Sequence, residues 1–232
     1  MASELPLLAL FDVDGTLFLT HDALSEQALR ETLGARYGVS LGPDALDRVD
    51  HRGQTALRIA REVLRAEGVA DDAIDEHLSA WCDSFTARYV DLLAGADTRD
   101  WQAARGAGAA LSGLQQAGVR LALLTGNPER MARARMERLG LAHFFPAGQG
   151  AFGCDAEDRS DLIELARERA GGWPAAATVA VGDTERDVRS AHRSGIRVIA
   201  VRSWRNAGAL AAADALCEDL DCAATALLAW AG

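Results

Sequence analysis

Short, uninterrupted hydrophobic runs recur along the chain, and most of them end abruptly at glycine and polar residues. The first is PLLALF at residues 6–11, followed directly by DVDGT, and similar runs occupy residues 119–126, 177–183 and 196–201. Runs of this length, rich in leucine and β-branched residues, are typical of strands buried on both faces. They predict four strands of a parallel sheet, with polar residues at the strand ends.

Between these runs lie longer stretches that are typical of helices, at residues 105–117, 128–139, 158–170 and 184–194. Strands that alternate with helices predict an α/β fold, a Rossmann-like parallel sheet with helices on both faces. The polar segments DVDGT, TGNP and GDTERD should then meet beyond the carboxyl ends of the strands, where such sheets bind ligands. The alanine-rich tail from residue 207 is predicted to be helical, apart from one short apolar break.

One long segment interrupts the alternation of strands and helices. Residues 20–94 contain no convincing strand and have the pattern of helices. We therefore predict a small all-helical cap domain at residues 19–96. It is inserted into a core domain made of residues 1–18 and 97–232.

The composition is that of a folded protein with an acidic surface. Hydrophobic residues make up 49% of the 232, and 34 acidic residues outnumber 24 basic ones, which gives a net charge of −10. A broad basic surface for nucleic acid is therefore not expected. Because the start of the chain lacks a basic region and no run approaches a membrane span, we expect no membrane association and a cytoplasmic location.

The basic residues and the cysteines exclude further classes of chemistry. Every basic residue is arginine, so a Walker A loop and a Schiff-base lysine, which both need lysine, are excluded. The four cysteines, Cys82, Cys154, Cys217 and Cys222, are widely spaced and form no zinc-binding pattern. They are expected to be structural thiols.

Carboxylates gather at the predicted strand ends. Asp12 and Asp14 follow the first strand, and Gly15 permits a tight turn that brings both carboxylates to one site. Asp183 follows a later strand, and Asp187 comes one helical turn after it. Acids so close together stay ionised near neutral pH only beside a cation, and hard oxygen ligands favour Mg²⁺. The candidate ligands are Asp12, Asp14, Asp183 and Asp187.

Paired aspartates also occur as simple turn or helix caps, so the stronger argument is the combination of three motifs. FDVDGT, LLTGN and GDTxxD each follow a predicted strand, in this order. Together they resemble the motifs of the haloacid dehalogenase-like superfamily, over nearly the whole chain and with a helical cap after the first motif. The chain looks most similar to the phosphoglycolate phosphatase-like subfamily. The resemblance implies a phosphoric monoester hydrolase that acts on a small phosphate ester with Mg²⁺ as cofactor.

The resemblance also implies a role for each acid. Asp12 would attack phosphorus and become a transient aspartyl phosphate, while Asp14 would protonate the leaving oxygen and later deprotonate water. Mg²⁺ would be held by Asp12, the backbone carbonyl of Asp14 and Asp183. Asp187 would fix a ligand or a metal-bound water.

Other candidate residues would bind the phosphate or the rest of the substrate. Thr125, at the end of the second core strand, matches the second family motif, in which its hydroxyl and the following N–H hold a phosphoryl oxygen. A threonine at a strand end is also a common turn cap. In the cap, HRGQT supplies polar residues that either reach into a cleft or form an ordinary turn. The candidate substrate-binding residues are therefore Thr125, Gly126, Asn127, Arg159, Arg52, Gly53 and Gln54.

Arg159 marks the place where the chain departs from the family pattern. The third family motif is usually a lysine, and this chain has none. Arg159 fits that position best, because it lies just before or within the first turn of a predicted helix, where members of this subfamily can carry arginine. A guanidinium can grip two phosphoryl oxygens and stays charged, so it could keep the role with different geometry. We expect it within hydrogen-bond reach of Asp12. The alternative is a solvated arginine paired with Glu157 or Asp158.

Other functions remain open alongside the phosphatase. A haloacid dehalogenase would form an ester at the same Asp12, but such enzymes lack the second aspartate, and Asp14 suits an alkoxide leaving group that needs a proton. A sugar phosphomutase usually has a basic, histidine-bearing cap loop, which HRGQT matches only in part. A response-regulator-like domain and a phospho-ligand-binding protein without catalysis are further alternatives. The sequence specifies neither the substrate nor the oligomeric state.

Overall fold

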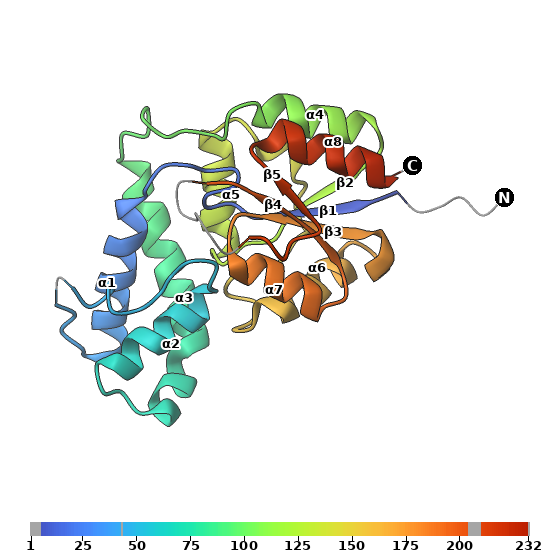
Figure 1. Cartoon of the computed structure of the whole chain (residues 1–232). Coiled ribbons are helices and arrows are strands. Elements are labelled where there is room, and N and C mark those ends of the chain that lie inside the picture. Colours follow the sequence, from blue (N-terminus) through green and yellow to red (C-terminus); the bar gives the residue numbers. More distant parts are fainter. Residues whose placement is uncertain (1–5, 43, 204–209, 232) are drawn as a thin grey trace.

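A five-stranded parallel sheet forms the centre of the computed structural model, which describes residues 6–42, 44–203 and 210–231 (Figure 1). The strands are β1 (Leu8–Phe11), β2 (Arg120–Leu123), β3 (Thr178–Gly182), β4 (Arg197–Val201) and β5 (Ala215–Cys217). They lie in the order β2-β1-β3-β4-β5, and every neighbouring pair is parallel. The predicted α/β fold is confirmed.

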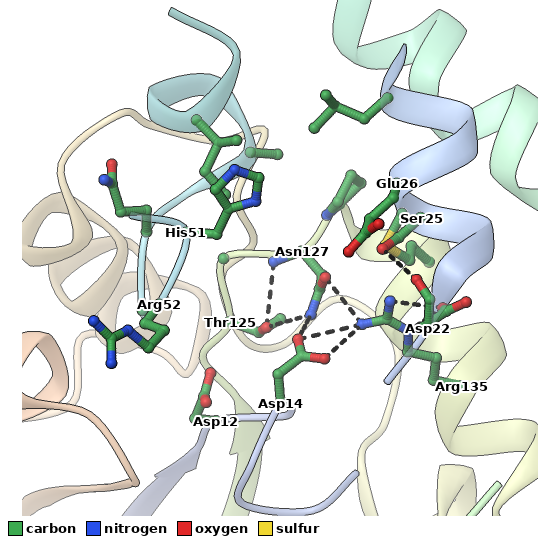
Figure 2. Close-up of a pocket in the computed structure, with 18 of the residues that line it drawn as sticks. Asp12, Asp14, Asp22, Ser25, Glu26, His51, Arg52, Thr125, Asn127 and Arg135 are labelled. Carbon is green, nitrogen blue, oxygen red and sulfur yellow. Dashed lines mark hydrogen bonds and ion pairs between the residues drawn. The ribbon is translucent and has the colours of Figure 1, made fainter. Parts of the chain in front are cut away.

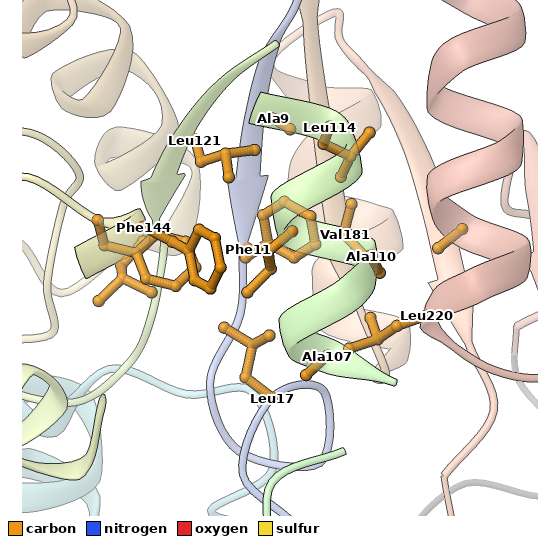
Figure 3. Close-up of a cluster of buried hydrophobic side chains, with 14 of the residues drawn as sticks. Ala9, Phe11, Leu17, Ala107, Ala110, Leu114, Leu121, Phe144, Val181 and Leu220 are labelled. Atoms are coloured by element: carbon orange, nitrogen blue, oxygen red, sulfur yellow. The ribbon is translucent and has the colours of Figure 1, made fainter. Parts of the chain in front are cut away.

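Helices cover both faces of this sheet. One face carries α4 (Ala107–Gln116), α5 (Glu129–Arg138) and α8 (Leu220–Ala231), and the other carries α6 (Arg159–Arg169) and α7 (Glu185–Arg193). Side chains alternate between the faces of a strand, so Ala9 and Phe11 of β1 enter one hydrophobic cluster while Leu8 and Leu10 enter the other. Figure 3 shows the first cluster around Phe11. Burial on both faces explains the uninterrupted hydrophobic runs of the strands.

The segment between β1 and α4 forms three helices that lie to one side of the sheet (Figure 1). They are α1 (Ala23–Tyr37), α2 (Ala56–Ala66) and α3 (Asp71–Ala94). These helices, which we call the cap, share a hydrophobic cluster that includes Leu33, Leu64, Trp81 and Phe85, and Met131 of α5 also enters it. The cap thus packs on itself and against α5 beside the sheet, while a separate cap domain with boundaries at residues 19–96 stays a prediction.

The cap is attached to the core at the amino-terminus of α2. The backbone N–H of Ala56 donates to the carbonyl of Gly126 at 2.8 Å, and that of Leu57 donates to the carbonyl of Gly153 at 3.2 Å. A Cβ atom on Gly126 would lie 1.9 Å from the carbonyl oxygen of Gln54, and one on Gly153 would lie 1.7 Å from that of Gly126. Only glycine permits three backbone segments to approach so closely.

The four cysteines, predicted to be thiols, form two disulfides in the structure. Cys82 of α3 pairs with Cys154 in the loop before α6, and Cys217 pairs with Cys222. The Cα atoms of the first pair are 6.1 Å apart although 72 residues separate them in the chain. The prediction was wrong because tertiary packing, which the cysteine spacing does not reveal, brings α3 to that loop. This disulfide is a covalent link between cap and core.

The carboxyl-terminal tail is less helical than predicted, because its described residues 210–219 form turns and one strand and helix α8 begins only at Leu220. Residues 207–209 lie outside the described residues, and Ala215–Cys217 is strand β5 rather than a break within a helix. Three residues are too few to show a strand pattern, and β5 exists because it pairs with β4. Among the described residues, no helix is long and apolar enough to span a membrane.

Candidate active site

Three polar strand ends meet at the carboxyl edge of the sheet. Asp12 follows β1, Thr125 follows β2 with one residue between, and Asp183 follows β3, and all three side chains are buried. They converge because β1 is hydrogen-bonded to β2 on one side and to β3 on the other. A cavity of about 490 Å³ opens beside them, and Asp12, Asp14 and Thr125 are among its lining residues. The structure therefore brings the predicted motifs together.

Asp12, Asp183 and Asp187 form a buried acidic cluster. One carboxylate oxygen of each lies within 4.8 Å of the others. Asp187 is fixed by a capping box at the start of α7, where its carboxylate accepts the backbone N–H of Thr184 at 2.8 Å. Asp183 accepts a hydrogen bond from the hydroxyl of Ser203. Local helix and loop structure thus positions two of the three acids.

Gly15 permits the turn that seats this cluster. Its φ angle is 86°, in the left-handed region that side chains disfavour. A Cβ atom at this position would lie 2.2 Å from Oδ2 of Asp183. The glycine of the first motif is therefore needed both for the turn and for the close approach of Asp183.

Arg159 lies buried beside these acids. Helix α6 begins at Arg159 because the side chain of Asp158 accepts the backbone N–H of Ser160 at 2.8 Å and so caps the helix. The Nη2 atom of Arg159 lies 2.9 Å from Oδ1 of Asp12 and also pairs with Asp187. The predicted contact between Arg159 and Asp12 is present.

Neither acidic neighbour of Arg159 in the sequence pairs with its side chain. Glu157 pairs with Arg61 of α2 through two hydrogen bonds of 2.8 and 2.7 Å. The hydroxyl of Thr55 donates to the backbone carbonyl of Glu157 at 2.9 Å, and Asp158 serves as the cap of α6. The alternative of a solvated pair is therefore wrong, and this loop is a second place where α2 binds the core.

The acids outnumber the cation inside this cluster. Burial raises the pKa of Asp12 well above its usual value, Arg159 opposes that rise, and Asp187, Asp183 and Asp14 add to it. One arginine does not balance so many neighbouring carboxylates. A divalent cation bound among these hard oxygen atoms would restore the charge balance.

The second motif lines the cavity next to Asp14, as Figure 2 shows. The side-chain amide of Asn127 donates to Oδ2 of Asp14 and to Oγ1 of Thr125, the latter at 2.9 Å. The backbone N–H of Thr125 donates to the carbonyl of Ala151 at 3.2 Å. Thr125 and Asn127 are therefore fixed in place, and Asn127 also orients Asp14.

A second buried arginine, Arg135 of α5, contacts Asp14 from the other side (Figure 2). Its Nη1 lies 2.9 Å from Oδ1 of Asp14, and its Nη2 lies 2.7 Å from Oδ2 of Asp22, which caps α1. The hydroxyl of Tyr89 on α3 donates to the same oxygen of Asp22 at 2.7 Å. Arg135 thus links Asp14 to two helices of the cap.

Arg135, Asp22 and Tyr89 were not among the predicted site residues. A signal for Arg135 was present, because it lies on the buried face of α5, four residues after Met131 and next to Met136. An arginine at an apolar position of an amphipathic helix requires buried acidic partners. Nothing in the local sequence identifies Asp22 and Tyr89 as those partners.

The predicted cap residues lie at the cavity, and each also makes a hydrogen bond or ion pair with another part of the protein. The side chain of Arg52 is 60% exposed, and its Nε lies 3.0 Å from Oδ1 of Asp50. The amide of Gln54 donates to the backbone carbonyl of Asp50 at 2.6 Å. The carbonyl of Gly53 accepts a hydrogen bond from Nη1 of Arg159 at 3.4 Å. A substrate-binding role for these three residues stays a prediction.

Comparison with known proteins agrees with this geometry. A model of haloacid dehalogenase-like hydrolases matches residues 7–195. The phosphoglycolate phosphatase of Rhodospirillum rubrum is 33% identical over 198 residues, which cover 84% of this chain and 79% of the relative. The crystal structure of CbbY from Rhodobacter sphaeroides in complex with phosphate superposes with a TM-score of 0.64 at 22% identity, covering 93% of this chain and 95% of that one.

A predicted phosphatase from Clostridium acetobutylicum has a TM-score of 0.67 at 20% identity, covering 97% of this chain and all of the other. Sequence identities this low support the shared fold alone. The chain belongs to the haloacid dehalogenase-like hydrolase family, as its motifs predicted. Its relatives within that family confirm that it is a phosphatase enzyme.

Proposed function

We propose that the chain is a Mg²⁺-dependent phosphatase that hydrolyses a small phosphorylated metabolite through an aspartyl phosphate on Asp12. The observation that carries this proposal is the buried cluster of Asp12, Asp183 and Asp187 with Arg159 against it. A nucleophilic carboxylate, a set of hard metal ligands and one fixed cation are the parts that phosphoryl transfer to an aspartate requires.

The residues present fit a magnesium ion. Asp12 and Asp183 would hold it together with the backbone carbonyl of Asp14, and Asp187 would fix a ligand or a bound water. The close approach that Gly15 permits leaves Asp183 next to the turn after β1, which suits such a shared site. When bound, the ion supplies positive charge that screens the phosphoryl oxygens from the carboxylates.

In the first half-reaction, an oxygen of Asp12 forms a bond to phosphorus and the bond from phosphorus to the ester oxygen breaks. Asp14 donates a proton to that oxygen, so the alcohol leaves uncharged. The side chain of Asp14 is 30% exposed at the cavity, which allows it to reach a leaving group there. Asn127 and Arg135 hold it in that position.

In the second half-reaction, Asp14 removes a proton from water, and the water oxygen attacks phosphorus. The bond between phosphorus and Asp12 breaks, which releases inorganic phosphate and restores both aspartates. Thr125 contributes its hydroxyl and the following N–H to a phosphoryl oxygen. Arg159, already in contact with Asp12, reduces the repulsion between the nucleophile and the phosphate dianion.

The test is a screen of phosphorylated metabolites with Mg²⁺, ranked by kcat/KM, which includes phosphoglycolate because of the named relatives. Exhaustive chelation should abolish turnover and Mg²⁺ should restore it. Ca²⁺ should restore it poorly, because it tolerates more ligands and can engage both oxygens of the nucleophile. Full activity after chelation would contradict the metal requirement.

The intermediate needs a test of its own. A fluoroberyllate complex, which mimics a phosphoryl group on aspartate, should crystallise with beryllium within bonding distance of an oxygen of Asp12. Beryllium bound to any other residue would exclude Asp12 as the nucleophile.

A further inference from the structure

The cavity extends well beyond the phosphoryl site, toward the helices of the cap. Its volume of about 490 Å³ is in the range that encloses an organic ligand rather than a phosphate alone. Its lining includes residues of α1, α2, α3 and α5. The far part of the cavity must therefore enclose the leaving group of the ester.

The wall around that leaving group has an apolar part, next to polar residues such as Ser25 and His51. The apolar part is formed by side chains from four helices and one loop: Leu29, Leu46, Ile59, Phe85 and Met131. Carbon atoms of a ligand that are covered by a wall of this kind are removed from water, which favours binding. A leaving group of two carbons with a carboxylate would cover little of it.

Each arginine that lines the cavity already has acidic partners. Arg159 pairs with Asp12 and Asp187. Arg135 pairs with Asp14 and Asp22. Both arginines lie at the phosphoryl end of the cavity, and their charge is balanced there.

Arg52 is the remaining arginine of the lining, and its side chain is not directed toward the cap end. It pairs with Asp50 at 3.0 Å and is mostly exposed. Figure 2 shows its guanidinium pointing away from Glu26, on the opposite side of the cavity. Among the described lining residues, the cap end therefore offers a second anion of the substrate the histidines His21 and His51 but no arginine, and the chain contains no lysine.

An acid occupies the cap end instead. Glu26 of α1 lines the cavity and is drawn in Figure 2 beside Ser25. Its carboxylate lies 3.4 Å from Nε2 of His21, and both side chains are partly exposed, at 46% and 65%. Such an exposed pair neutralises little charge. A carboxylate or second phosphate on the leaving group would meet Glu26 as a like charge.

We propose that the leaving group is an alcohol with an apolar body and no second anionic group, with a hydrogen-bond donor that faces Glu26. This inference rests on the phosphatase function proposed above and narrows its substrate class. It sets this chain apart from enzymes whose substrate carries a carboxylate beside the phosphate. A hydroxyl or an ammonium group satisfies Glu26, whereas an anion leaves it repelled.

The test compares esters of one skeleton that differ in charge. Phosphoglycolate carries a carboxylate, 2-hydroxyethyl phosphate is its neutral analogue, and phosphoethanolamine is the cationic one. A second series, 2-(hydroxyphenyl)ethyl phosphate and 2-(carboxyphenyl)ethyl phosphate, adds apolar surface. We expect kcat/KM to be at least about tenfold lower for the carboxylate member of each series, and highest for the hydroxyphenyl ester, which combines an apolar body with a hydrogen-bond donor.

Substitution of Glu26 should change this selectivity. In Glu26→Gln, kcat/KM for phosphoglycolate relative to 2-hydroxyethyl phosphate should rise about fivefold, because the like charge is gone. Glu31→Gln is the matched control, since Glu31 lies on the same helix, pairs with Arg88 and is not among the cavity residues. It should leave the ratio unchanged.

The outcomes separate the two proposals. Hydrolysis of phosphoglycolate as fast as that of its neutral analogue overturns the substrate class but leaves the phosphatase intact. An equal change of the ratio in both variants also overturns it, because Glu26 would then act through the fold. If no ester of either series is hydrolysed with Mg²⁺, the proposed function fails, and the substrate class fails with it.

Discussion

The phosphoryl end of the cavity and its cap end are held in place by different means. At the phosphoryl end, side chains follow strands whose pairing fixes them, and Asp12 and Asp187 share the buried cation Arg159. At the cap end, side chains come from helices packed beside the sheet, and Glu26 is partly exposed. The rigid phosphoryl end suits a reaction whose geometry must not vary. At the cap end, by contrast, a few substitutions can change which substrate is bound.

The largest effect is expected at the phosphoryl end, from Asp12→Asn. The amide keeps the size of the side chain but is a poor nucleophile and metal ligand, so kcat should fall by about three orders of magnitude or more. The variant should keep the melting temperature of the parent. Asp91→Asn, on the exposed surface of α3, is the control. Activity of Asp12→Asn within tenfold of the parent would rule out the assignment.

Arg135 links Asp14 to Asp22 at the start of α1, so its removal should destabilise the contact between the core and the cap. In Arg135→Met, Asp22 remains buried without its cation, and the free energy of unfolding should fall by about 3–5 kcal/mol. Denaturant titration measures this loss. Arg189→Met breaks an exposed pair with Glu185 and should cost less than about 0.5 kcal/mol. Similar losses in both variants would mean that the buried network stabilises the fold no more than an exposed ion pair does.

Arg159→Ala tests the phosphoryl end alone. Transition-state stabilisation should fall by about 2–4 kcal/mol, the scale for one preorganised electrostatic contact, measured as kcat/KM. Arg159→Lys should recover part of the loss, because the charge returns without the two-pronged geometry. If Arg159→Ala keeps the parental kcat/KM, another arginine holds the role, and Arg52 would be tested next.

The smallest effect concerns movement of the cap, which we expect to close over the substrate about hinges near residues 17–21 and 94–100. The disulfide between Cys82 and Cys154 ties α3 to the core, so the oxidised protein should move less. Small-angle scattering with and without fluoroaluminate should show a larger compaction in Cys82→Ser than in the parent. Identical profiles for the parent and for Cys82→Ser, each with and without fluoroaluminate, would contradict a moving cap.

The sequence predicts the phosphoryl end well because its residues follow local patterns. Asp12, Thr125 and Asp183 each come after a buried strand, and parallel pairing then brings them together. The position of Arg159 is also readable, because Asp158 before it is a helix cap.

The remaining contacts depend on tertiary packing between distant segments. Arg135 meets Asp22 across 113 residues, and Cys82 meets Cys154 across 72. No local pattern specifies such pairs. Strand β5 was missed for a related reason, since its three residues form a strand only through pairing with β4.

The crossing of three backbone segments at Gln54, Gly126 and Gly153 bears on how caps can be exchanged between members of the family. Neither glycine has room for a Cβ atom, and the first turn of α2 hydrogen-bonds to both loops. A cap grafted from another member would therefore need a backbone of the same shape at this crossing. The side chains on the rest of its helices could differ. Chimeras that keep these three segments from one parent should fold and have new substrate selectivity. Chimeras that take the three segments from different parents should fail to fold.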